Sequence, residues 1–165
     1  MFQDQFLLGV VSGVVANIVM DIPEYTLWKI QLIRHPLSHY AGSLFLDQQS
    51  MHHTWHGSIV GFLADYTYSA LLGIIFIYLL SAAQREDANS GDYLRKGVFY
   101  GAFIWLFSFG GLRSLAIIKL REVAPGDALI FFFLHLLFGL VLGWMARKNQ
   151  RSNRRKTEKP EDIRT

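Results

Sequence analysis

Residues 128–146 read ALIFFFLHLLFGLVLGWMA, a run of nineteen with one polar side chain, His135. A helix needs about 20 mostly apolar residues to cross the hydrocarbon core of a bilayer. The apolar stretches of this chain cover residues 6–28, 57–80, 97–118 and 127–146. They lack the alternation of barrel strands and the narrow apolar stripe of soluble helices. The sequence therefore predicts an all-α protein, a bundle of four transmembrane helices.

Composition divides the chain into two parts. Residues 1–146 form one membrane domain, and residues 147–165 form a basic tail with eight Lys or Arg against three acidic residues, which we expect to be disordered. A basic segment directly after a membrane helix is attracted to anionic lipid headgroups, so lipid and not nucleic acid is its expected partner. The chain has no cysteine, which excludes disulfides, thiolate catalysis and cysteine-ligated metals.

Basic residues in the loops predict the orientation. The N-terminus, residues 81–96 and the tail would share one side of the membrane and hold eleven Lys or Arg, whereas the loops at 29–56 and 119–126 hold four. Cytoplasmic loops carry the excess of Lys and Arg. We therefore expect a multi-pass protein of the plasma (inner) membrane with both termini in the cytoplasm.

Local signals predict where helices begin and end. Pro23 should kink the first helix or end its regular part near Ile22, and part of the long outer loop that follows should be helical. The third helix should begin after the Ser-Gly-Asp turn at 90–92. Asp127, after Pro125-Gly126, is a natural N-cap for the fourth helix.

Two internal similarities indicate a doubled helical hairpin. The first is the pattern G-V-x-x-G, which occurs at 9–13 and again at 97–101. The second is a polar residue eight positions before a Leu-Gly pair, which aligns Asp65 with His135. The two halves would then be related by an axis along the membrane normal.

Each predicted helix carries a G-x-x-x-G pattern, and the glycines are Gly9, Gly13, Gly57, Gly61, Gly97, Gly101, Gly139 and Gly143. Small residues one turn apart let helices approach closely in lipid. Most of these glycines fall in the cytoplasmic half, so the bundle should be tight there and looser outside. The same patterns also suit a homo-oligomer or a membrane partner, but packing within one chain is the simpler interpretation.

Polar residues of the predicted helices gather in the outer half. Asn17, Asp21 and Glu24 continue the glycine stripe of the first helix. The other helices contribute Asp65, Arg113 and His135. Such groups face the bundle interior, pair with one another or line a hydrated cavity. A structural interpretation pairs Arg113 with Asp21 or Glu24 and joins Asp65 to His135, whereas a functional one makes the cluster a site for a cation, a proton or a small polar ligand.

The outer loop is rich in histidine. His52 and His56 are spaced i, i+4, which on a helix points two imidazoles the same way, and His53, His39 or Asp47 could supply a third ligand for a divalent metal. The H-E-x-x-H motif of zinc peptidases is absent. Metal binding is therefore the second interpretation of this loop, after interfacial anchoring beside Trp55.

The segments G-V-V-S-G-V-V-A-N, H-G-S-I-V-G and G-V-F-Y-G-A-F-I-W, spread between Gly9 and Gly143, make the chain resemble small uncharacterised four-helix bacterial membrane proteins of the YqhR-like kind. The resemblance implies the fold and brings no catalytic residues with it.

The residues favour a binding protein over an enzyme, since no reaction motif is present. The leading interpretation is a membrane protein that binds a small ligand or cation in an outer polar cavity. The alternatives are a metal-dependent membrane enzyme that uses the outer histidines and a structural accessory subunit of a membrane complex.

Overall fold

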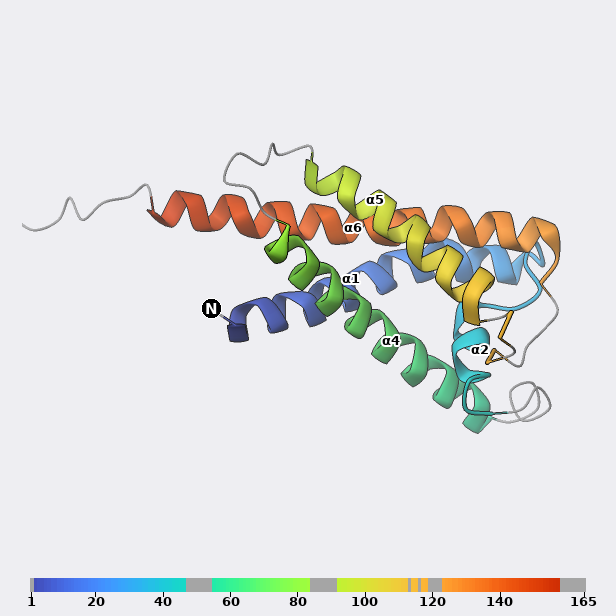
Figure 1. Ribbon diagram of the computed structural model, residues 1–165. Coiled ribbons are helices and arrows are strands. Elements are labelled where there is room, and N and C mark those ends of the chain that lie inside the picture. Colours follow the sequence, from blue (N-terminus) through green and yellow to red (C-terminus); the bar gives the residue numbers. More distant parts are fainter. Residues whose placement is uncertain are drawn as a thin grey trace, which may run out of the picture.

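The computed structural model describes residues 2–46, 55–83, 92–112, 114–115, 117–118 and 123–157, with side chains described between residues 4 and 152. All regular structure in these ranges is helical (Figure 1). The elements are α1 (Phe2–Lys29), α2 (Leu37–Gly42), α4 (Trp55–Ala82), α5 (Asp92–Trp105), the π-helical segment η1 (Leu106–Leu112) and α6 (Pro125–Thr157). The prediction of an all-α fold with a partly helical first loop is confirmed.

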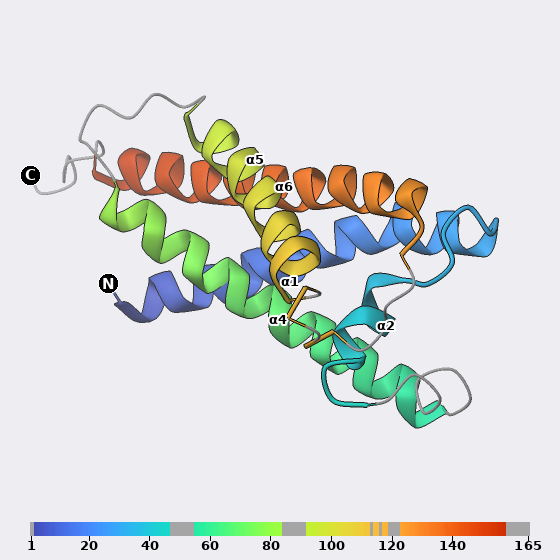
Figure 2. The ribbon, with the colours of Figure 1, turned by 45° about the vertical axis from the view of Figure 1, so that its right-hand side comes forward.

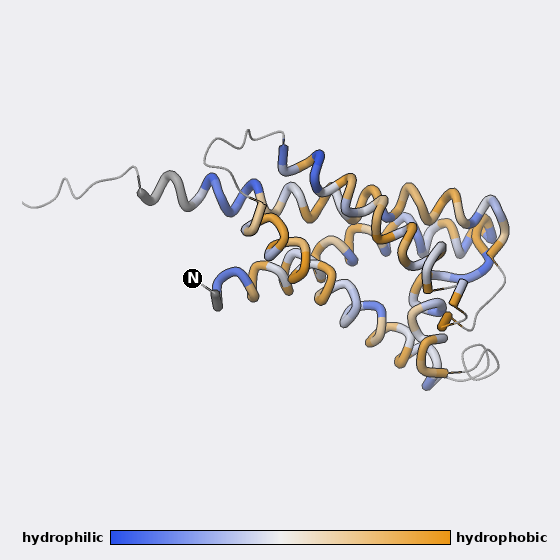
Figure 3. The backbone as a smooth tube through the Cα atoms, in the orientation of Figure 1, coloured by the Kyte–Doolittle hydropathy of each residue, from blue (hydrophilic) through white to orange (hydrophobic). Residues whose placement is uncertain are grey.

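Three of these helices, α1, α4 and α6, are long and apolar enough to cross a membrane. The segments are Asp4–Lys29, Trp55–Ala82 and Pro125–Ser152, of 26, 28 and 28 residues. At 1.5 Å per residue they measure about 40 Å, more than the hydrocarbon core requires. Figure 3 shows hydrophobic residues along these helices and hydrophilic ones where α1 begins and where α6 leaves its neighbours. By length and composition, the chain is a membrane protein.

The long helices form two antiparallel pairs. α1 packs mainly on α4, and α5 packs mainly on α6. α1 also packs on α6, and this contact joins the two pairs. Both ribbon views place the start of α1 and the end of α6 at the same end of the molecule (Figures 1 and 2). At the opposite end α4 diverges from α6, and α2 packs against α4 there.

Glycines bring α1 and α4 into direct main-chain contact. A Cβ added at Gly13 would overlap the carbonyl of Ser69, and one at Gly73 would overlap the main chain of Gly9 and Gly13. Helices in lipid associate through such close contacts because burying apolar side chains gains little there. The expected role of these glycines in helix packing is confirmed.

A second set of glycines joins α5 to α6 near the same end of the molecule: Gly97, Gly101, Gly139 and Gly143. Gly101 lies against the carbonyl of His135 as Gly13 lies against that of Ser69. The remaining predicted pair, Gly57 and Gly61, is buried on α4. The close main-chain contacts of these glycines therefore lie toward the end of the molecule that holds the termini of the described chain.

The contacts also correct the register of the sequence repeat. Ser69 and His135 occupy equivalent positions, each facing the second glycine of its partner helix. The sequence similarity aligned Asp65 with His135, which is wrong by one helical turn. Leu-Gly pairs recur by chance in apolar helices, so a pattern match alone does not fix the register.

α1 continues through Pro23 to Lys29. The alternative that its regular part ends near Ile22 is therefore wrong, and the alternative of a kink at Pro23 stays a prediction. A proline removes one N–H donor from the helix, here the one that would bond the carbonyl of Val19, and the helix continues past this gap. The chain leaves α1 at Gln31, whose φ of 60° lies in the left-handed region that follows many helix ends.

The third helix begins at Asp92, as predicted, but it does not reach residue 118. It changes from α to π geometry after Trp105 and ends at Leu112. π turns have less favourable hydrogen bonds, and Gly110 and Gly111 near the end are poor helix formers. Together they explain the early end.

α6 differs from the prediction at both ends. It begins at Pro125, which suits a first helical position because proline has no N–H to leave unpaired, so Asp127 is not the N-cap. Asp127 instead accepts a hydrogen bond from the main-chain N–H of Arg34 at 3.3 Å. The expected disorder of the tail is wrong for residues 147–157, because α6 continues to Thr157 through Lys, Arg and Gln, which favour helix. The rest of the tail lies outside the described residues.

Candidate binding cavity

Asn17 is the polar centre of the α1–α4 crossing. Its Nδ2 donates a hydrogen bond to Oδ2 of Asp65 at 2.9 Å, and its Oδ1 accepts one from the hydroxyl of Ser69 at 2.8 Å. All three side chains are buried. A buried amide without partners costs free energy, so these two bonds fix both the amide and the carboxyl group.

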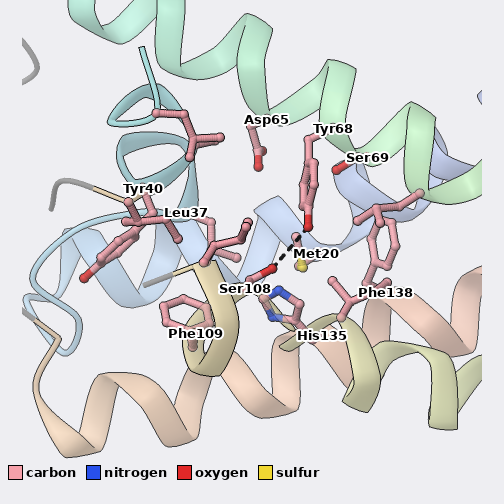
Figure 4. A pocket seen from close by; sticks show the side chains of 16 residues that line it. Met20, Leu37, Tyr40, Asp65, Tyr68, Ser69, Ser108, Phe109, His135 and Phe138 are labelled. Atoms are coloured by element: carbon pink, nitrogen blue, oxygen red, sulfur yellow. Dashed lines mark hydrogen bonds between the residues drawn. The ribbon is translucent and has the colours of Figure 1, made fainter. Parts of the chain in front are cut away.

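A cavity of about 60 Å³ lies beside this network, where the two helix pairs diverge. Its wall is mostly apolar. α2 contributes Tyr40, and the other polar side chains are Asp65, Tyr68, Ser69, Ser108 and His135. Figure 4 shows the latter side chains extending toward one another from α4, η1 and α6. No Lys or Arg belongs to the described lining.

His135 reaches the cavity from the middle of α6. Its Nδ1 lies 2.7 Å from the carbonyl oxygen of Phe131. Because a carbonyl only accepts, Nδ1 carries a proton, and Nε2 is an acceptor whenever the ring is neutral. The edge of the ring contacts Phe109, with ring centres 6.0 Å apart. The orientation of the imidazole is therefore fixed by its own helix and by η1.

Two tyrosine hydroxyls bridge α4 to the third helix. Tyr68 pairs with the hydroxyl of Ser108 at 3.2 Å, and Tyr100 donates to the carbonyl of Leu72 at 2.8 Å. Ser108 and Phe109 belong to η1, and both are buried. The π turn thus places a hydroxyl and an aromatic ring in the wall of the cavity.

α2 covers the cavity with Leu37, Tyr40 and Ala41. The Tyr40 ring packs against Phe131, with ring centres 5.5 Å apart. A carboxyl oxygen of Glu24 accepts a hydrogen bond from the main-chain N–H of Leu37. The end of α1 therefore holds the first turn of α2 in place over the cavity.

The structure brings together part of the predicted polar cluster. Asp65 and His135 line one cavity, but their hydrogen bonds go to Asn17 and Phe131, so the predicted bond between them is wrong. Asp21 is half-buried, accepts a hydrogen bond from Tyr66 at 2.9 Å and lies outside the lining.

Arg113 lies outside the described residues. Its predicted pairing with Asp21 or Glu24 therefore stays a prediction.

The predicted metal ligands fall mostly beyond the described part of the chain. Asp47, His52 and His53 lie outside it. His56 is exposed and stacks on Trp55, with ring centres 3.7 Å apart. Within the described residues, no group of three or more His, Asp or Glu side chains could hold a metal ion.

Sequence reasoning missed Tyr68, Ser69 and Ser108. Ser69 follows Asp65 by one turn and so shares its face, a signal that was available. Ser108 is a polar residue within an apolar stretch, and the tendency of such residues to face the interior of a bundle also indicated it. Tyr68 offered no such signal, because tyrosine is common at membrane surfaces.

No family model, curated protein or solved structure matches this chain.

Proposed function

We propose that this chain is a four-helix transmembrane protein of the plasma membrane, built as a doubled hairpin, that binds a small polar ligand or cation in the cavity. The fourth crossing would be α5 with η1, which have 14 and 7 residues and together suffice for a bilayer. The loop charges orient the termini toward the cytoplasm and the cavity toward the outside. The Lys148 ammonium lies 5.2 Å above the Trp144 ring, a pairing that suits a membrane interface with anionic lipid.

The convergence of polar side chains in the cavity carries this proposal. The Asp65 carboxyl group, the His135 imidazole and the hydroxyls of Tyr68, Ser69 and Ser108 come from three helical segments and line one mostly apolar cavity. Polar groups at membrane depth are costly, and those that persist usually serve a ligand, an ion or a proton. With acceptors present and no Lys or Arg in the described lining, a cation or a hydrogen-bonding ligand suits the cavity better than an anion does.

Silver-ion protection of an introduced thiol tests whether the cavity admits a small cation. The chain has no cysteine, so Ser108→Cys provides a single thiol in the cavity wall. The purified protein is treated with Ag⁺, then unfolded and alkylated, and mass spectrometry counts the alkylated thiols. We expect Ag⁺ to protect the thiol of Ser108→Cys, and to protect it more slowly when Asp65→Asn removes the nearby carboxylate.

Ser12→Cys is the matched control. Ser12 is fully buried, at 0% exposure, but lies outside the cavity lining, so Ag⁺ should leave its thiol open to alkylation. Equal protection of the two thiols, or none at Ser108→Cys, would overturn the proposal that the cavity takes up small cations.

A further inference from the structure

The size of the cavity limits what it can hold. An apolar cavity that binds benzene has a volume of about 150 Å³, and a cavity of roughly 10–15 Å³ is the smallest that holds one water molecule. The cavity here measures about 60 Å³. It therefore has room for a small cluster of water molecules and is smaller than the cavity that binds benzene.

The polar lining matches this size. A buried water needs two to four hydrogen-bonding partners. The Asp65 carboxyl, the Tyr68–Ser108 pair and Nε2 of His135 supply acceptors and donors on facing walls of the cavity (Figure 4). Water can therefore bridge the carboxyl group to the imidazole, which have no direct hydrogen bond.

We propose that the ligand of this site is the proton, held on a small water cluster and shared between Asp65 and His135. This inference rests on the proposed binding function and names its ligand class. In the transfer, the O–H bond of the Asp65 carboxyl breaks and its electron pair stays on oxygen. Water relays the proton, and an N–H bond forms at Nε2 of His135. The neutral pair becomes a carboxylate and an imidazolium, and the reverse step restores it without any other reactant.

Asp65 and His135 are the carboxyl group and the imidazole of the described lining. α2 contributes Tyr40 to the lining, and α4 contributes Tyr68, whose hydroxyl pairs with Ser108. The acidic groups of α1 are bonded elsewhere, Asp21 to Tyr66 and Glu24 to the main chain of Leu37. The described residues of α5 and η1 add no titratable side chain to the lining.

Infrared spectroscopy of the purified full-length protein at neutral pH tests the sharing. A protonated carboxyl group has its own C=O band, and the part that belongs to Asp65 disappears in Asp65→Asn. Replacing His135 by Gln removes the second acceptor, so the proton stays on Asp65 and this band should grow relative to that of the wild type. His56→Gln, at an exposed histidine outside the cavity, should leave the band unchanged.

An unchanged band in His135→Gln would overturn proton sharing, as would the absence of any Asp65 band in both proteins. If His135→Gln does not fold, the wild type with ¹⁵N-labelled histidine gives the answer. The Nε2 resonance of His135 should then move when Asp65→Asn is introduced, and a fixed resonance would contradict the proposal. Silver protection of Ser108→Cys without these changes would leave cation binding standing and remove only the proton as its ligand.

Discussion

Glu24 shows how a single buried carboxyl group can position a separate element. It is 1% exposed at the end of α1, and one of its oxygens accepts the Leu37 N–H at the start of α2. Within the described residues, the other oxygen is buried and has no hydrogen-bond partner. The residue therefore holds α2 through one acceptor, while its second oxygen has no hydrogen-bond partner in the described part of the chain.

Replacing Glu24 separates the hydrogen bond from the charge. Glu24→Gln keeps a carbonyl oxygen for the Leu37 N–H, so in thermal unfolding in detergent it should lower the free energy of unfolding by less than Glu24→Ala does. Glu24→Ala leaves that buried N–H unpaired and should lower the free energy of unfolding by ~1–3 kcal/mol. If Gln proves as damaging as Ala, the charge itself is needed, which would support the predicted ion pair with Arg113.

At the scale of elements, the two helix crossings depend on the absence of side chains. Gly13 and Gly101 face carbonyl groups of the partner helix, and main-chain atoms cannot move aside as a flexible side chain can. Gly126 lies in the first turn of α6, where an added Cβ would meet no atom within 4 Å, so it offers a matched comparison.

Glycine-to-alanine substitutions should therefore have opposite effects at these sites. Gly13→Ala and Gly101→Ala should each lower the free energy of unfolding by ~1–3 kcal/mol, as overpacking does, although alanine is the better helix former. Gly126→Ala should be neutral or stabilise by up to about 1 kcal/mol. Unfolding in detergent measures all three, and tolerance of alanine at both crossings would contradict the main-chain contact.

The sequence predicted the existence of the helices better than their geometry. Apolar length identified α1, α4 and α6, because crossing a bilayer requires about 20 apolar residues whatever their order. The change to π geometry after Trp105 could not be predicted, since a π turn depends on which hydrogen-bond register packing favours and not on composition. The sequence left open whether the helix ends or only kinks at Pro23 for a similar reason, because contacts beyond the helix decide whether it continues.

The same distinction holds for the cavity. Asp65 and His135 were predicted to share an interior because polar groups avoid lipid. Their hydrogen-bond partners were not predicted. Which groups bond depends on distances of about 3 Å, and the spacing of residues along one helix does not determine these distances. Ser108 became a wall residue only through the π turn.

At the scale of the whole molecule, chemical labelling of single introduced cysteines can determine the orientation of the helices in the membrane. A cysteine introduced for labelling must be accessible to the reagent. Ser43 lies in the first loop but is fully buried, so a cysteine at this position would not react. Leu32 and Ala83 are exposed, follow α1 and α4 respectively, and carry no main-chain strain.

In intact cells, Leu32→Cys should react with an impermeant maleimide from outside, and Ala83→Cys only after permeabilisation. The reason is the excess of Lys and Arg on the side that holds the termini. The reverse pattern would invert the orientation and place the cavity toward the cytoplasm, and labelling of both residues from one side would contradict a crossing by α4.

The network at Asn17 has a consequence for biosynthesis. Asn17 finds its partners, Asp65 and Ser69, on a helix that the ribosome makes later. Until α4 emerges, α1 would hold an unpaired amide and two acidic groups at membrane depth, where such groups are costly. In the described part of α5 and η1, the charged groups lie near Asp92. The rest of this segment has few polar groups besides tyrosine and serine hydroxyls. The growing chain should therefore enter the bilayer as the α1–α4 hairpin, with α1 waiting for its partner, and α5 and α6 should assemble on that completed pair.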